Sequence, residues 1–408
     1  MKAKISSFFL FGFSAFVGFS QGYQANFQGQ KQQAMGSAGT GLLLDGASLF
    51  FNPGASSFLE KSSINAAVSP VFANVMFQES GTQAIGRTNS PVSTPFAFYA
   101  VFKPKKLEKW AFGFAAYTPF GSTISYEDGW LGRFALTRLQ LSSIFFQPTV
   151  SYKISDKWGI GGGFVICDGK VNLQKDLPVQ FDDSSYAHVE LSGKSIGFGG
   201  NLGLYFKPTE KWSFGLTYRT QLNMKLKDGN ADFTVPDAVA DKFPDGKFTG
   251  ALPLPQIASF GVGYNPIEQL KLALDVNFIG FKAYDTLAFD YEQNTSSLLD
   301  SKLPRMYHNT FAFRFGAQYK VIEQLDLRVG VAYSLPPSDD DYVTPETPDA
   351  RKIALSAGLT YRPIEKFQID ASVIYAKFKR NSTNQELNLY GTYSVIAIIP
   401  GIGLTYNF

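Results

Sequence analysis

The end of the chain constrains its fold more than any other segment. From Ile396 to Phe408 the even positions carry Ile, Ile, Pro, Ile, Leu, Tyr and Phe, while the odd positions are mostly small or polar. A period of two indicates a β-strand with one apolar face. A strand that finishes the chain on an aromatic residue is typical of a closing strand in a transmembrane β-barrel. A soluble sandwich strand alternates too, but it would not usually end on its outermost apolar side chain, because chain ends fray.

The start of the chain predicts export. Lys2 and Lys4 precede an apolar run from Ile5 to Phe19, and the small residues Gly18 and Ser20 follow as a cleavage site. This pattern predicts a signal peptide over residues 1–20. The alternative is a membrane anchor, but the run is shorter than the roughly 20 residues that a spanning helix needs. Mean hydropathy is only −0.06, which still fits a barrel, because alternation hides its apolar face from averaging.

Composition points to the same class. Aromatic residues make up 15% of the chain and charged residues only 17%, below the usual quarter or so. Loss of Lys2 and Lys4 lowers Lys plus Arg from 37 to 35, against 34 acidic residues, and such a balance does not suggest nucleic-acid binding. The single cysteine, Cys167, excludes an intramolecular disulfide. We expect it to be a buried or membrane-facing apolar residue.

A short pattern with an aromatic residue, charged residues, often Pro, and a second large apolar residue recurs along the chain. The six copies are Phe102–Trp110, Tyr152–Trp158, Phe206–Trp212, Tyr264–Leu270, Tyr319–Leu325 and Tyr361–Phe367. Pro and the charged residues favour a tight turn, and the flanking aromatics fit the interfacial girdle of a membrane barrel. Ordinary hairpin turns of a soluble β-protein are the alternative interpretation.

The strands beside these turns have one apolar and one polar face. Asp275, Arg328 and Asp370 lie on polar faces. A Lys or Arg facing mid-membrane lipid costs about 2–4 kcal/mol, so these faces are expected to line the lumen. Six turns on one side, with both chain ends on that side, predict fourteen antiparallel strands. Longer polar connections are expected at the exterior, namely 122–130, 228–250, 294–303 and 336–349.

Residues 21–60 do not alternate and are too few for a domain of their own. They are rich in Gly, Ala and Ser, but Leu42–Leu44 and Phe50–Phe51 would be unfavourable in a solvated periplasmic tail. We therefore predict a plug at residues 21–60 inside a barrel of residues 61–408. Predicted lumen positions on the last strands include Ile374 and Val395, which are unusual in a water-filled pore.

Several motifs in fixed order carry a family resemblance. They are Ala34–Gly41, Asp45, Phe51-Asn-Pro53, Thr118–Gly121, Trp130–Phe134, Gln147–Tyr152, Gly161–Gly163, Leu252–Pro255 and Pro348–Gly358. On these the chain resembles the FadL-type outer-membrane transporters, which take up long-chain fatty acids and hydrocarbons, over nearly its whole mature length. One departure is Gly54, where the family's plug has Ala after Asn-Pro.

The resemblance implies an all-β, 14-stranded antiparallel transmembrane barrel with an N-terminal plug in the bacterial outer membrane. It implies passive uptake of long-chain fatty acids or similar apolar compounds. The ligand would bind an apolar lumen pocket and leave sideways into the membrane, through a kink in the third strand near Trp110–Gly121. A general porin for polar solutes and a surface adhesion or structural barrel are the alternative functions.

Ten residues are the candidates for ligand binding or gating. They are Phe50, Phe51, Asn52 and Pro53 in the plug, Gly113, Pro119, Phe120 and Gly121 at the kink, and Arg314 and Arg328 in the lumen. Pro removes a strand donor and Gly loosens pairing, so a break in the third strand is expected, although simple termination at Pro119 is also possible. The two arginines suit a carboxylate headgroup. They equally suit a lumen salt-bridge network with Asp326, Asp275 or Asp370.

No catalytic or metal-binding pattern is complete. Gly193-Lys-Ser195 lacks the first glycine of a P-loop, and His188 and His308 stand apart from other metal ligands. We therefore expect no enzyme activity, cofactor or metal. The expected partners are an apolar small molecule, outer-membrane lipid, and the barrel-assembly machinery through the strand ending in Phe408. A monomer is expected.

Overall fold

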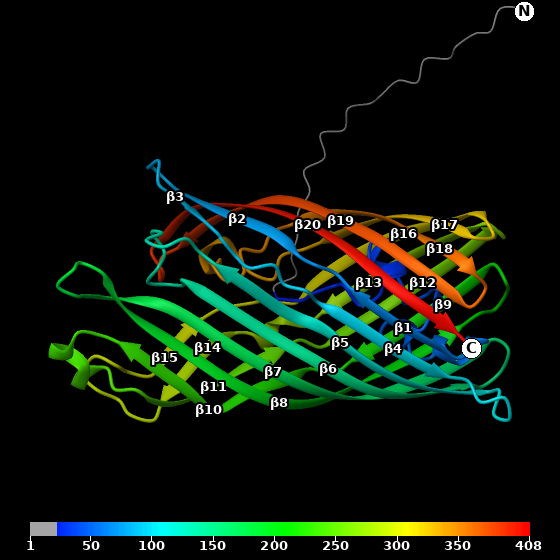
Figure 1. Cartoon of the computed structure of the whole chain (residues 1–408), viewed down its shortest axis with the longest axis horizontal. Coiled ribbons are helices and arrows are strands. Elements are labelled where there is room, and N and C mark those ends of the chain that lie inside the picture. The colour runs from blue at the N-terminus through cyan, green and yellow to red at the C-terminus, as the bar shows by residue number, and fades with distance from the viewer. Residues whose placement is uncertain (1–22) are drawn as a thin grey trace, which may run out of the picture.

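The structure is a computed structural model that describes residues 23–408. The predicted signal peptide, residues 1–20, lies outside the described residues. The described chain forms one antiparallel sheet that closes on itself (Figure 1). Closure joins the first strand to the last. β1 (Ser63–Val68) pairs with β20 (Leu389–Asn407) from Ser63 opposite Asn407 to Val68 opposite Ile402.

The barrel has fourteen strands, as the turn count predicts. Eight are continuous segments, namely β5 (Trp110–Ser125), β6 (Arg138–Lys153), β7 (Trp158–Gln180), β8 (Tyr186–Phe206), β17 (Leu325–Ser334), β18 (Lys352–Ile364), β19 (Phe367–Asn384) and β20. Six are split in two, namely β1 with β2 (Phe72–Glu79), β3 (Ile85–Arg87) with β4 (Phe96–Phe102), β9 (Trp212–Arg219) with β10 (Leu222–Thr234), β11 (Gly246–Leu254) with β12 (Ile257–Ile267), β13 (Leu270–Ile279) with β14 (Thr286–Tyr291), and β15 (Ser301–Pro304) with β16 (Thr310–Ile322).

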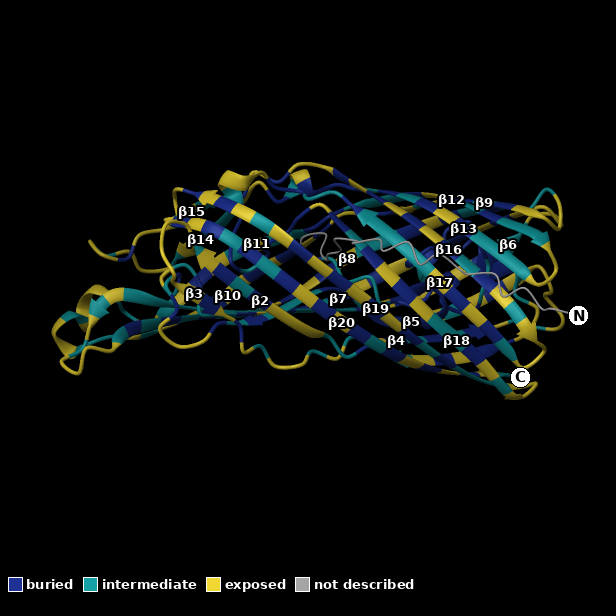
Figure 2. Cartoon of the chain, turned by 90° about the horizontal axis from the view of Figure 1, so that it is seen from above, coloured by how far each residue is buried: buried dark blue, intermediate teal, exposed yellow. Residues whose placement is uncertain are grey.

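Buried and exposed residues alternate along many of the strands (Figure 2). One face of the wall therefore points into the barrel and the other points outward. On β17, Leu327 and Val329 are exposed on the outside, whereas Asp326 and Arg328 are buried inside. The assignment of charged faces to the lumen is therefore confirmed. The outer face meets lipid, where exposed apolar side chains are at no disadvantage. Among residues 23–408, no helix is long and apolar enough to cross a membrane.

The six predicted turns join the strands that they were expected to join. The first, Phe102–Trp110, links β4 to β5, and the last, Tyr361–Phe367, links β18 to β19. Their aromatic residues stack between neighbouring turns: the rings of Trp158 and Phe206 lie 4.1 Å apart. The first strand begins and the last strand ends at this end of the barrel, which is the periplasmic end by its short turns.

One exterior connection differs from expectation. The segment between β17 and β18 was expected to be a solvated loop, but it folds inward, with Val343 and Asp349 completely buried. Two buried ion pairs hold it, Arg305–Glu346 at 2.8 Å and Lys352–Asp349 at 3.0 Å. Its short helix η4 (Asp340–Tyr342) faces the barrel wall, where Asp340 Oδ1 lies 3.1 Å from Arg380 Nε. No cluster of three or more potential metal ligands occurs in the described part of the chain.

The N-terminal segment 23–60 lies inside the barrel and is mostly buried. It contains α1 (Gln30–Gln33), α2 (Ser48–Phe51) and the 3-10 turn η1 (Ala55–Phe58). The strands of the barrel enclose these short helices (Figure 1). The backbone amides of Gly39 and Thr40 both donate to Asp275 Oδ2 of the wall, at 2.8 Å each. Gly215 of β9 approaches this segment so closely that an added Cβ would lie 1.9 Å from the Thr40 carbonyl oxygen.

The remaining short helices, η2 (Asp237–Lys242) and η3 (Phe281–Ala283), lie in connections at the exterior half of the barrel. Phe281 of η3 is completely buried and packs edge-on against Tyr23, with ring centroids 5.6 Å apart. This connection therefore turns into the lumen and meets the start of the described chain.

Candidate functional site

The wall has a slit between its second and third strands. β4 and β5 pair from Phe102 opposite Phe112 to Ala97 opposite Tyr117. Above that point the two strands separate, and they meet again where the Asn89 amide donates to the Ser125 carbonyl oxygen at 2.9 Å. Residues 90–95 on one side and 119–124 on the other form the edges of the slit.

Local sequence explains the separation. Residues 90–95 read Ser-Pro-Val-Ser-Thr-Pro, and two prolines in six residues prevent regular pairing because proline has no amide to donate. Across the slit, the pairing of β5 with β6 shifts register between Tyr117 and Phe120. Such an irregularity bends a strand locally. The bend at Pro119 exposes the inner edge of β5 to a different partner.

That partner is the N-terminal segment. The Ala25 amide donates to the Pro119 carbonyl oxygen at 2.8 Å, and the Gly121 amide donates to the Tyr23 carbonyl oxygen at 3.0 Å. Residues 23–25 thus replace the second strand along this stretch of β5. The wall and the segment inside it are therefore connected at the slit.

The third strand differs from expectation in two respects. It was expected to end near Gly121, but β5 continues to Ser125, so termination at Pro119 is wrong. Gly113 was expected to loosen the pairing of this strand, but it pairs regularly with Val101 and Thr149. An added Cβ there would lie 2.4 Å from Leu49, so this glycine gives room to α2.

A cavity of about 610 Å³ lies at the slit, and we call it the side cavity. Its lining includes Val395 and Ile399, which face the lumen, and Val92 and Phe96, which are exposed on the outer face. Phe120 also lines it. The side cavity therefore contacts both faces of the wall, and its volume is in the range of about 300–1,000 Å³ typical of small-molecule sites.

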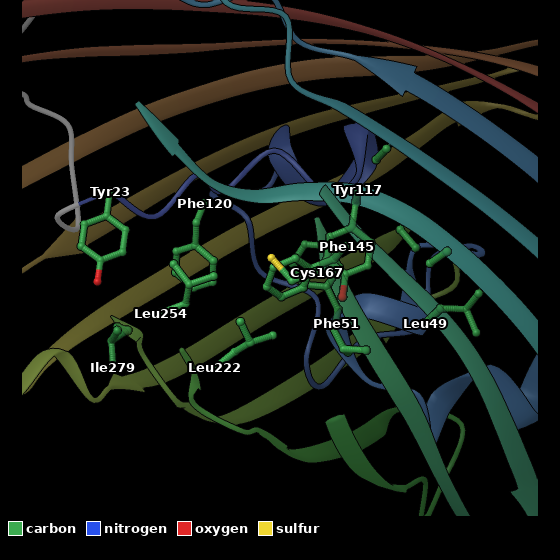
Figure 3. Close-up of a cluster of buried hydrophobic side chains, with 14 of the residues drawn as sticks. Tyr23, Leu49, Phe51, Tyr117, Phe120, Phe145, Cys167, Leu222, Leu254 and Ile279 are labelled. Atoms are coloured by element: carbon green, nitrogen blue, oxygen red, sulfur yellow. The ribbon is translucent and has the colours of Figure 1, made fainter. Parts of the chain in front are cut away.

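Beside this cavity a cluster of apolar side chains fills the lumen, which we call the lumen cluster (Figure 3). It joins the N-terminal segment to several strands of the wall. Its members include Tyr23, Leu49, Phe51, Tyr117, Phe120, Phe145, Cys167, Leu222, Leu254 and Ile279. Burial raises the pKa of Tyr23 well above its usual value. The Tyr23 hydroxyl therefore stays protonated and donates to the Pro253 carbonyl oxygen.

Arg219 at the end of β9 is a buried cation at the edge of the lumen cluster. Its Nη1 donates to Tyr117 Oη at 2.6 Å, and its guanidinium lies over the ring of Phe50, 4.5 Å from the centroid. No ion pair of Arg219 occurs in the described part of the chain. A small cavity of about 40 Å³ adjoins it, and Phe51 and Asp275 also line that cavity. The sequence analysis missed this residue, although the alternation of β9 puts it on the lumen face.

The two predicted arginines have protein partners. Arg314 donates to the Ser37 carbonyl oxygen at 2.9 Å and to Asn26 Oδ1 at 2.8 Å, and it thereby holds the N-terminal segment. Arg328 Nη2 lies 3.4 Å from Asp326 Oδ2, in a network that also includes Arg362. Arg328 thus has the geometry of the predicted salt-bridge network. Recognition of a carboxylate by either arginine stays a prediction.

The four candidates of the N-terminal segment lie at its contact with the wall. Asn52 Nδ2 donates to the Thr40 and Leu204 carbonyl oxygens at 2.9 and 3.0 Å, and the Pro53 carbonyl accepts from Ser151 Oγ at 2.7 Å. Phe50 and Phe51 instead face the lumen cluster, each in edge contact with the other at 5.0 Å. Asn52 and Pro53 therefore anchor the segment, while the two phenylalanines border the space in which a ligand would lie.

The departure at Gly54 has a structural reason. A Cβ at this position would lie 2.6 Å from the Gly203 carbonyl oxygen and 2.8 Å from that of Gly159. Alanine here would require the segment to move away from β7 and β8. This chain places its Asn-Pro turn directly against those strands.

A closed fourteen-stranded antiparallel barrel with an apolar outer face defines the class of outer-membrane β-barrel proteins. The chain belongs to the family described as "Outer membrane protein transport protein (OMPP1/FadL/TodX)", whose model matches residues 13–408. It is a family of transport proteins of the outer membrane and not one of enzymes.

Individual relatives are distant but cover nearly the whole chain. The long-chain fatty acid transport protein of Escherichia coli strain K12 is 20% identical, with 87% of each chain covered. A Pseudomonas aeruginosa FadL homologue has a TM-score of 0.83 at 20% identity, over 95% of this chain and 100% of the homologue. The toluene transporter TodX of P. putida has a TM-score of 0.75 at 17% identity, over 94% and 99%. At these identities the structural likeness shows the fold.

Proposed function

We propose that the protein is a passive channel for hydrophobic molecules, with long-chain fatty acids or similar apolar compounds as its substrates. They enter from outside, bind among the apolar side chains of the lumen, and leave sideways into the membrane through the slit beside β5. The side cavity carries this proposal, because its lining includes both lumen-facing and lipid-facing residues. The family membership and the names of the E. coli and P. putida relatives support it.

Burial of alkyl groups supplies the driving force. Each methylene that leaves water for an apolar site is stabilised by about 0.8 kcal/mol. An apolar lumen therefore concentrates long chains, which a polar channel would not. Release into the membrane keeps the chain in an apolar medium throughout, so no step requires its return to water.

Uptake of labelled oleate tests the transport function. Cells that express the protein are expected to take up oleate faster than cells that lack the gene, and mass spectrometry is expected to find apolar lipids bound to the detergent-extracted protein. Equal uptake with and without the gene would contradict the proposal.

A cleavable cross-linker tests the sideways step. Val92→Cys and Ser122→Cys put thiols on opposite edges of the slit, while native Cys167 is buried. Bridging the two thiols is expected to stop oleate uptake, and reduction is expected to restore it. The control joins Asn172→Cys to Ser192→Cys, which lie opposite each other on a closed strand pair. Uptake that continues with the slit bridged would exclude this exit while leaving transport itself intact.

We also propose that residues 21–60 act as a plug. Support comes from the place of residues 23–60 inside the barrel and from the hydrogen bonds that Gly39 and Asn52 donate to Asp275 and Leu204. Deleting residues 21–60 is expected to raise single-channel conductance in a planar bilayer. A general porin for polar solutes would instead conduct with the segment in place, and unchanged conductance after the deletion would exclude the plug.

A further inference from the structure

The outer surface of β7 and β8 changes from apolar to charged residues toward the exterior end of the barrel. From the periplasmic end, β8 presents Phe206, Leu202, Phe198 and Ile196 to lipid, and all but the half-buried Phe206 are exposed. The eleven residues from Ile196 to Phe206 rise about 25 Å across the membrane along a tilted strand, which is the height of the apolar band of such barrels. The next outward residue, Lys194, therefore lies at the exterior edge of the membrane.

A second lysine lies directly opposite the first. Lys170 of β7 and Lys194 of β8 are register partners, both exposed on the outer face. Like charges directly opposite each other on neighbouring strands destabilise a sheet. The positions just below are Asp168 of β7 and Ile196 of β8, followed by Ile166 and Phe198, so this lysine pair stands at the boundary between lipid and headgroup.

No carboxylate of the described residues lies within ion-pair distance of either lysine. Of the ion pairs found among residues 23–408, none includes Lys170 or Lys194. Glu190, higher on β8, accepts instead from the amides of Asn172 at 2.5 Å and Gln174 at 3.1 Å. Asp168, one step below Lys170, is likewise absent from those ion pairs.

The neighbouring strand extends the positive charge. Ser142 of β6 lies opposite Lys170, and Arg138, four residues further out, lies opposite Gln174 on the same outer face. Arg138 belongs to none of the ion pairs either, and its Nε is buried without a hydrogen-bond partner. Cations on three adjacent strands thus face the layer in which the headgroups of the outer leaflet lie.

We propose that Lys170 and Lys194, with Arg138 above them, bind the phosphate group of a lipid in the outer leaflet. A phosphate oxygen placed between the two ammonium groups accepts a charge-assisted hydrogen bond from each and removes their repulsion. The acyl chains of the same lipid would then lie along Ile166, Ile196 and Phe198 below. The site is lipid-facing and separate from the lumen.

Native mass spectrometry of the full chain in an uncharged detergent tests the proposal. The probes are dioleoyl phosphatidic acid, dioleoylglycerol, which has the same chains without phosphate, and inorganic phosphate. Lys170→Gln with Lys194→Gln removes the pair. Lys105→Gln with Lys106→Gln removes the same charge from exposed lysines in a periplasmic turn, and serves as the matched control.

The wild type and the control are expected to bind phosphatidic acid equally, and the Lys170/Lys194 double variant roughly tenfold more weakly or worse. Added phosphatidic acid is expected to raise the unfolding temperature of the wild type but not of that variant. Without lipid, the variant is expected to unfold at no lower temperature than the wild type. The proposal is overturned by unchanged binding in the variant, by an equal loss in the control, or by dioleoylglycerol or inorganic phosphate binding as tightly as the phosphatidic acid.

Discussion

At the scale of single residues, one carboxylate attaches the N-terminal segment to the wall. Asp275 is buried on β13, and its Oδ2 accepts from two consecutive backbone amides, those of Gly39 and Thr40. Hydrogen bonds to a charged group contribute about 1.5–3 kcal/mol each, more than neutral ones. This residue is therefore expected to hold the segment more firmly than any single apolar contact.

Asp275→Ala removes the oxygen that accepts from both amides and leaves two buried amides unpaired. We expect a more mobile segment and a higher single-channel conductance, with the barrel itself still closed. Asp241→Ala, on the exposed helix η2, is the control and is expected to conduct like the wild type. Equal conductance in the two variants would contradict this role.

Arg219 is the residue whose chemistry bears most directly on the substrate. Its partners are a hydroxyl, an amide oxygen and a carbonyl, supplied by Tyr117, Gln147 and Phe50. A guanidinium with neutral partners is suited to receive a carboxylate. We therefore expect it to favour substrates with an acidic headgroup over plain hydrocarbons.

Arg219→Met is expected to weaken oleate binding about tenfold to a hundredfold, since a hydrogen bond to a charged group is lost. Binding of a hydrocarbon without a headgroup is expected to change little, and titration calorimetry compares the two. Arg351→Met, at an exposed exterior position, is the control. A parallel loss for both ligands would show that Arg219 supports structure only.

At the scale of elements, the contact between the N-terminal segment and the wall depends on missing side chains. β9 passes the segment at Gly215, where a Cβ would meet the Thr40 carbonyl oxygen. The same wall has side chains elsewhere along its inner face, so this position is fitted to the segment. Packing of this kind tolerates no added volume.

Gly215→Val is expected to displace the segment from β9 and raise conductance, while the strands stay paired. Gly246→Val adds the same side chain at a position with nothing within 4 Å, and is expected to leave conductance unchanged. The test fails if both variants conduct like the wild type.

At the scale of the whole molecule, the first and last strands meet at one seam. β1 and β20 pair over residues 63–68 and 402–407, and the Phe408 amide donates to the Ser62 carbonyl oxygen at 3.0 Å. The Phe408 side chain stays exposed and lies beside Tyr406, 6.2 Å between ring centroids. We expect the assembly machinery to recognise this exposed terminal aromatic side chain.

Deleting Phe408 is expected to lower the amount of protein inserted in the outer membrane severalfold, measured as the heat-modifiable fraction on a gel. Asn407→Ala keeps the terminal aromatic and is expected to insert normally. Normal insertion without Phe408 would contradict recognition through this residue.

The sequence predicts the barrel well because its signals are local. Period-two alternation assigns Asp326 and Asp275 to the lumen, and six turns give the strand count. It does not predict what meets across the lumen. The partners of Arg219, the inward fold of the segment around Val343, and the pairing of Tyr23 with Gly121 join residues far apart in the chain. Those contacts depend on closure of the barrel, which no local pattern encodes.

The order of synthesis and the seam together restrict how this molecule is assembled. Residues 23–60 emerge before any strand, yet they finish enclosed by strands that extend to the other end of the chain. The β1–β20 seam is the last pair to become available, so we expect the leading segment to lie between the strands before the seam closes. A separate peptide of residues 21–60, added to a finished barrel that lacks them, is therefore expected to enter the lumen less readily than the attached segment.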